Sequence, residues 1–188
     1  IAAALMALRT LMLLRPWKAE AGERPAMFAA YGAAWGVLLA AVTAVWGLAL
    51  IPGILQPVAY FEQLFWGTGH TLQLANMLFM LLAWLWIANS WGLVGTASRN
   101  WSRMVLFLGV LPLLAVPVLL FAYPPASADY KVGFTDLMRW GSWLAAVPLG
   151  LSILWRLRRN TEMPLSIRTG LKFSILLFFF GIIIGAFI

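Results

Sequence analysis

The sequence predicts an all-α protein, a polytopic bundle of transmembrane helices with five complete spans and a partial one. Hydrophobic residues make up 63% of the 188 residues and charged residues only 10%, and the mean hydropathy is +0.91. A soluble domain of this size cannot bury so much apolar surface, so the composition favours the membrane class. Apolar stretches of about 20 residues, the length that a helix needs to cross a bilayer, recur along the chain.

These stretches give the expected elements in chain order. Residues 1–15 are expected to be the end of a helix. The complete spans are expected at Ala26–Ile51, Glu62–Trp91, Met104–Tyr123, Phe134–Trp155 and Gly170–Ile188. The connections are short, so residues 1–188 are expected to form a single transmembrane helical domain. Because the first and last residues both fall inside apolar runs, we expect a fragment that is cut at both ends.

The basic residues are distributed unevenly between the two sides that alternating spans define. Lys131 and Arg139 fall on one side, and the other eleven of the 13 lysines and arginines fall on the opposite side. The positive-inside rule places the more basic loops in the cytoplasm. The net charge of +7 is then explained by topology and lipid head groups, so the lipid bilayer is the expected partner and no nucleic acid is expected. The eleven are Arg9, Arg15, Lys18, Arg24, Arg99, Arg103, Arg156, Arg158, Arg159, Arg168 and Lys172.

The single histidine, His70, falls inside a span. An ionisable group at membrane depth is costly to bury and indicates a functional site, and imidazole is the commonest metal ligand in proteins. On a helix, Trp66, His70, Gln73, Asn76 and Met77 share one face. We expect this polar stripe to face something other than lipid. The structural alternative is an imidazole that is hydrogen-bonded to a carbonyl group or to Gln73.

Other metal and charge sites are limited by composition. The chain has no cysteine, which excludes disulfides, iron–sulfur clusters and thiolate zinc sites within it. Glu62 precedes His70 by eight residues, near the outer mouth of the predicted bundle. It either lines a proton or ion path or is an interfacial charge.

Three segments carry a resemblance to a known family. The stretch L-F-W-G-T-G-H-T-L-Q at 64–73 resembles the sixth-helix motif of subunit I of the heme-copper oxidase superfamily, commonly written L-F-W-F-F-G-H-P-E-V-Y. The segments A-A-V-P-L-G at 145–150 and L-F-F-F-G-I-I-I-G-A-F-I at 177–188 resemble motifs of its eighth and ninth helices. A divergent bacterial branch with W-G-G-G-H-V-L-Q in the sixth helix is more similar still. The chain would cover about helices four to nine.

The resemblance implies a heme-copper oxidase subunit I-like fold and a respiratory terminal oxidase-like complex in the bacterial inner membrane. Such a complex reduces O2 or NO with electrons from cytochrome c or quinol, and it contains other subunits. His70 would be the candidate copper ligand, and Trp66 and Gln73 would lie around a heme or metal pocket. The heme ligands are expected outside this chain.

The alignment also implies departures from the family. Two adjacent histidines of the family fall near Tyr123–Pro125. Leu74 stands where oxidases have a tyrosine and nitric oxide reductases a glutamate. The copper site would therefore be degenerate.

A non-catalytic structural or transporter-like membrane subunit is the alternative. In such a protein, His70 and Gln73 form a buried polar pair that fixes helix packing. The redox interpretation predicts Soret absorption and loss of metal on His70→Ala. The structural interpretation predicts a colourless protein whose mutant loses only about 1–2 kcal/mol of stability.

Overall fold

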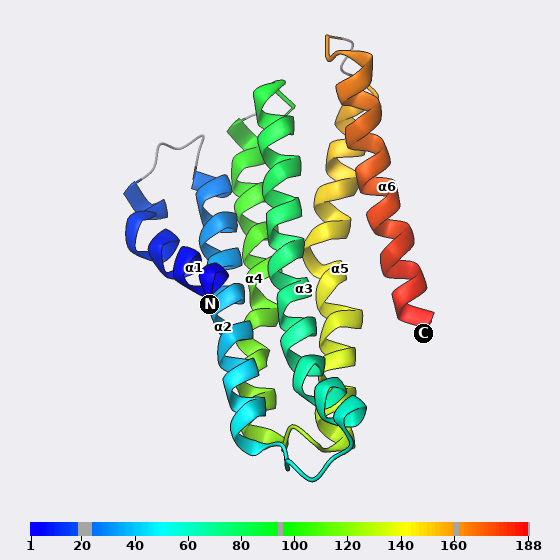
Figure 1. Ribbon diagram of the computed structural model, residues 1–188. Coiled ribbons are helices and arrows are strands. Elements are labelled where there is room, and N and C mark those ends of the chain that lie inside the picture. Colours follow the sequence, from blue (N-terminus) through cyan, green and yellow to red (C-terminus); the bar gives the residue numbers. More distant parts are fainter. Residues whose placement is uncertain (19–23, 94–95, 160–161, 188) are drawn as a thin grey trace.

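The computed structural model describes residues 1–18, 24–93, 96–159 and 162–187. All regular secondary structure in this part of the chain is helical (Figure 1). The elements are α1 (Ala2–Leu13), the 3-10 helix η1 (Pro16–Lys18), α2 (Arg24–Leu50), α3 (Pro57–Ser90), α4 (Thr96–Ala122), α5 (Ala128–Leu157) and α6 (Leu165–Phe187).

Five of these helices, α2 to α6, are long and apolar enough to cross a membrane. The predicted all-α class and the five spans are therefore confirmed. Helix α1 has 12 residues, about 18 Å at the usual rise per residue, so it is shorter than a hydrocarbon core of about 30 Å. It packs against α2.

The spans begin earlier than the apolar pattern predicts. Helix α3 begins at Pro57 and α5 at Ala128, each one to two turns before the predicted start. Proline suits the first turn of a helix, where its missing N–H has no intrahelical partner. At α5, the side chain of Ser127 accepts a hydrogen bond of 3.1 Å from the backbone N–H of Tyr130 and caps the helix. The predicted end of the last span, Ile188, lies outside the described residues.

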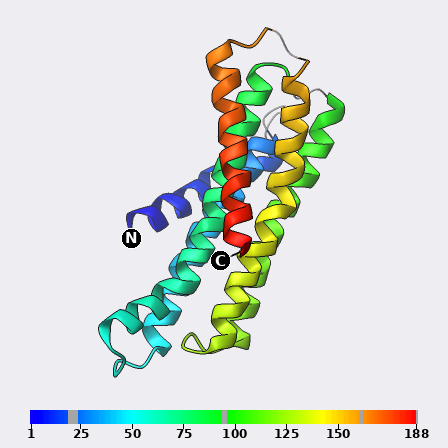
Figure 2. The same ribbon diagram turned by 90° about the vertical axis from the view of Figure 1, so that its right-hand side faces the viewer.

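Consecutive spans run in opposite directions (Figures 1 and 2). The connections 51–56 and 123–127 consequently lie at one end of the bundle. At the other end, which we call the basic end, α3 and α5 finish and α4 and α6 begin; Arg156, Arg158, Arg159 and Arg168 are among the residues there. The basic connections thus share one end. Lys131 and Arg139 lie within helix α5, although the charge pattern alone suggested a loop on the opposite side.

Helix α3 packs against α2, α4 and α5 and so occupies the centre of the bundle. Its buried side chains include Leu74, Leu78 and Leu81. Helix α6 packs mainly on α5, and it is joined to α3 by a hydrogen bond of 3.0 Å from Trp84 Nε1 to Ser174 Oγ. This arrangement covers one side of α3, which carries His70, with other helices.

Candidate functional site

The polar stripe predicted on α3 divides between two faces. Met77 is buried and Trp66 and His70 are partly buried, whereas Gln73 and Asn76 are exposed. The five residues are therefore not all buried within this chain, and what faces Gln73 and Asn76 stays a prediction. The physical reason is that each step of three residues falls about 60° short of a full turn, so Gln73 and then Asn76 rotate away from His70.

His70 is held from within its own helix. Its Nδ1 atom lies 2.6 Å from the carbonyl oxygen of Trp66, one turn earlier. A carbonyl oxygen can only accept, so Nδ1 carries the proton and the Nε2 of a neutral imidazole keeps a free lone pair. The ring centroid lies 5.2 Å from that of Trp66 and 6.5 Å from that of Phe134 on α5. The partner of His70 is thus a backbone carbonyl, which is one of the two partners that the structural alternative allows. Gln73 is exposed and does not form a buried pair with His70.

Trp66 is in turn bound to α5. Its indole Nε1 donates a hydrogen bond of 3.2 Å to the carbonyl oxygen of Lys131. The ammonium group of Lys131 lies 4.9 Å from the centre of the Trp66 ring and 2.6 Å from Glu62 Oε1. We call Glu62, Trp66 and His70 of α3 with Lys131 and Phe134 of α5 the His70 cluster. The cluster joins three successive turns of α3 to the first turns of α5.

The two glycines beside His70 have different surroundings. Gly67 is buried, and a Cβ atom there would overlap the hydroxyl oxygen of Tyr130 on α5. Gly69 has no heavy atom within 4 Å of an ideal Cβ position. Gly67 therefore permits close packing of Tyr130, which is 1% exposed, whereas Gly69 leaves open space next to the histidine.

Glu62 lies toward the start of α3, and its side chain is 51% exposed. Its carboxylate is engaged by Lys131, which fits an interfacial charge. The residue between Glu62 and His70 on this face is Trp66, whose indole does not titrate. No chain of ionisable side chains therefore joins Glu62 to His70 along this face of α3.

The donor set around His70 does not complete a metal site within this chain. Among the described residues, no group of three or more histidine, aspartate or glutamate side chains lies close enough together to hold a metal ion. The ring neighbours of His70 are the aromatic side chains of Trp66 and Phe134. A copper ion with three histidine ligands therefore does not fit these residues, although the free Nε2 of His70 fits the role of one ligand.

The α5 half of the cluster was not predicted from the sequence. The charge pattern puts Lys131 on the less basic side, and the apolar pattern begins a span at Phe134, but neither pattern predicts contact with α3. A signal for Lys131 does exist, because Lys131 and Glu62 carry opposite charges near the starts of two spans whose starts lie at the same end. Tyr130 and Phe134 are also four residues apart, and their ring centroids lie 4.7 Å apart.

Comparison with known proteins gives no relative from which a role can be transferred. No family model, no curated protein and no solved structure matches this chain. The resemblance to the heme-copper oxidases accordingly stays a prediction from three sequence segments, and the observed fold is that of a multi-pass helical membrane protein.

Proposed function

We propose that this chain is a membrane subunit of a respiratory terminal oxidase-like complex that transfers electrons from cytochrome c or quinol to O2 or NO. The observation that carries the proposal is the hydrogen bond from His70 Nδ1 to the Trp66 carbonyl oxygen. Metal-binding histidines are commonly fixed by such a bond, which orients the ring and leaves the other nitrogen as the ligand atom. The proposed location is the bacterial inner membrane, with the basic end in the cytoplasm.

In this proposal His70 contributes one ligand atom, and other chain segments or partner subunits contribute the rest. Heme, bound by residues outside this chain, would supply the redox chemistry. The backbone carbonyl group of Trp66 orients the His70 ring, and the indole of Trp66 donates a hydrogen bond to α5. Gln73 is exposed, so it would contact only a group or subunit that covers the outer side of α3.

A structural subunit is the second candidate, and a specific observation favours it as well. Two polar contacts of the cluster are made between α3 and α5, namely Glu62 with Lys131 and Trp66 with Lys131. Interhelical hydrogen bonds of this kind contribute about 0.6–2 kcal/mol each in membranes. On this second proposal the cluster only fixes how the two helices pack.

The experiment is a reduced-minus-oxidised visible spectrum of the purified complex, with pyridine hemochrome and copper analyses of the same sample. His70→Ala, His70→Asn and His70→Gln are compared with the unchanged protein. The amide nitrogen of asparagine lies near the position of Nδ1 and keeps a donor for the Trp66 carbonyl, but it offers no atom at the position of Nε2. A ligand role predicts that His70→Asn changes the spectrum or metal content as much as His70→Ala.

A matched control is Thr71→Val. Thr71 Oγ1 donates to the Gly67 carbonyl oxygen over 2.8 Å, so this change removes a similar bond within α3 without touching His70. The spectrum is expected to be unchanged. Absence of heme from the protein without substitutions refutes the redox proposal. In that case, a His70→Asn variant that keeps full stability while His70→Ala loses stability supports the structural proposal.

A further inference from the structure

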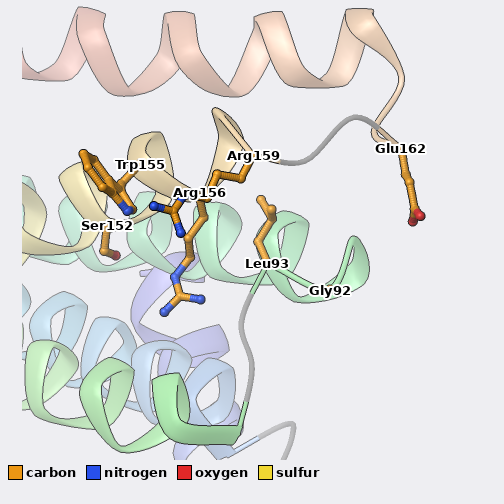
Figure 3. Close-up of a pocket in the computed structure, with 7 residues that line it drawn as sticks. All are labelled: Gly92, Leu93, Ser152, Trp155, Arg156, Arg159 and Glu162. Carbon is orange, nitrogen blue, oxygen red and sulfur yellow. The ribbon is translucent and has the colours of Figure 1, made fainter.

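An open pocket of about 630 Å³ lies at the basic end of the bundle, far from the His70 cluster along α3 and α5. One wall is the last turns of α5, with Ser152, Trp155, Arg156 and Arg159. The opposite wall is the end of α3 at Gly92 and Leu93 (Figure 3). The pocket thus lies between two helices at a level where α5 passes out of its apolar segment.

Two guanidinium groups lie in this pocket. Figure 3 shows that of Arg156 extending away from α5 and that of Arg159 turned back toward Trp155, while the carboxylate of Glu162 points away from both. Within the part of the chain that the structure describes, neither Arg156 nor Arg159 forms an ion pair with a carboxylate. Two arginines three residues apart therefore present unpaired positive charge to one space.

The turn at Gly92 and Leu93 and the hydroxyl group of Ser152 are already satisfied in their hydrogen bonding. Gly92 has a φ of 66°, and the N–H of Leu93 donates to the carbonyl oxygen of Ala88 over 2.9 Å, which closes α3 in the manner of a Schellman motif. Ser152 Oγ donates to the carbonyl oxygen of Leu149. The two arginines and the indole N–H of Trp155 are consequently the donors that this pocket offers to a ligand.

Trp155 completes the pocket. It is 58% exposed, and Arg159 lies 5.5 Å from its ring centre. An exposed tryptophan near the end of a span is typical of the membrane interface, where the ring lies at the level of the lipid head groups. A pocket at this level is accessible to the head group of a lipid whose acyl chains run along the bundle.

We propose that this pocket binds the phosphate group of an anionic phospholipid. Guanidinium groups match phosphate oxygens through paired N–H donors, and basic pockets between membrane helices on the cytoplasmic side bind anionic head groups. The carbonyl end of α5 carries about half a negative charge, which the two arginines outweigh. The exposed Trp155 favours a lipid over free inorganic phosphate, because its ring supplies an apolar contact for the glycerol and acyl region.

The test measures lipid binding to the intact protein in detergent by native mass spectrometry. The protein is titrated with phosphatidylglycerol and, in parallel, with phosphatidylcholine, and the double variant Arg156→Gln/Arg159→Gln is compared with the unchanged protein. The proposal predicts tighter binding of phosphatidylglycerol than of phosphatidylcholine. It also predicts a loss of phosphatidylglycerol affinity on the order of 30-fold in the double variant, from a loss of about fivefold for each arginine.

The matched control is Arg15→Gln/Lys18→Gln, which removes the same net charge from exposed residues that do not line the pocket. It is expected to keep an affinity within a few-fold of the unchanged protein. Equal losses in the two double variants would overturn the proposal, since general surface charge would then explain the binding. Inorganic phosphate that displaces phosphatidylglycerol at millimolar concentration would overturn the lipid as the ligand and assign the pocket to free phosphate.

Discussion

The hydroxyl oxygen of Tyr130 occupies the position that a Cβ atom at Gly67 would need. We therefore expect Gly67→Ala to lower the stability of the protein by about 1–3 kcal/mol, the usual cost of inserting a methyl group into a packed core. Thermal unfolding in detergent measures the loss. Gly69→Ala is the control, because no heavy atom lies within 4 Å of its ideal Cβ. It is expected to leave stability unchanged or to raise it by up to about 1 kcal/mol through helix propensity.

Combining Gly67→Ala with Tyr130→Phe tests the cause of that loss. Phenylalanine lacks the oxygen atom that the new methyl group meets, so the double variant is expected to recover part of the lost stability. An equal effect of Gly67→Ala and Gly69→Ala would contradict the close contact between α3 and α5.

The ion pair between Glu62 and Lys131 is expected to contribute little by itself. The two side chains are 51% and 26% exposed, so solvent screens their attraction, and Glu62→Gln is expected to cost less than about 1 kcal/mol. The cost is expected to vanish in about 1 M salt, where the screening length is about 3 Å. Lys131→Met is expected to cost more, because the ammonium group also lies over the Trp66 ring. A larger effect of Glu62→Gln than of Lys131→Met in urea or thermal unfolding would refute this order.

The hydrogen bond from Trp84 to Ser174 is expected to hold α6 against α3. Trp84 is 2% exposed, so Ser174→Ala leaves a buried indole N–H without its partner, which costs about 1–3 kcal/mol. Hydrogen exchange of α6 amides is expected to accelerate, while exchange in α2 is unchanged. Ser90→Ala is the control, since Ser90 bonds to the Trp86 carbonyl oxygen within the exposed end of α3. Identical exchange in the two variants would show that α6 is held by its contact with α5 alone.

The orientation of the bundle is testable with single cysteines, because the natural chain has none. Gly53→Cys lies in the connection between α2 and α3, and Glu162→Cys lies between α5 and α6 at the basic end. In intact cells with a permeable outer membrane, a membrane-impermeant maleimide is expected to label Gly53→Cys. Glu162→Cys is expected to be labelled only after the inner membrane is opened. The reverse pattern would invert the topology that the positive-inside rule predicts.

The sequence was sufficient for the helical class and the number of spans, because both follow from the length and apolarity of five segments. It placed the starts of α3 and α5 too late, at Glu62 and Phe134, although the residues just before them are already helical. Apolarity marks the part of a helix that lies in lipid, whereas the N-cap Ser127 and the first-turn Pro57 mark the true starts.

The candidate site could be predicted only on α3. Periodicity along one helix brought Trp66 and His70 together correctly, and the structure shows their contact through a backbone carbonyl. The same periodicity placed Gln73 on the inward face. The exposure of Gln73 depends on how far around α3 the neighbouring helices extend, which periodicity does not predict. The contact of Lys131 with Glu62 and Trp66 depends on the register between α3 and α5, and Lys131 is 69 residues from Glu62 in the sequence. A helical pattern within one segment contains no information about that register.

His70 lies close to the middle of its long helix. Helix α3 has 34 residues, about 51 Å at the usual rise per residue, and its midpoint falls between Gln73 and Leu74. His70 is therefore about 5 Å along the axis from the middle of the helix. In a bilayer centred on this helix, a proton or cation that reaches the imidazole from either face crosses about half of the transmembrane voltage, which corresponds to about 1 kcal/mol for each 100 mV. Any protonation or metal binding at His70 is thus expected to be electrogenic.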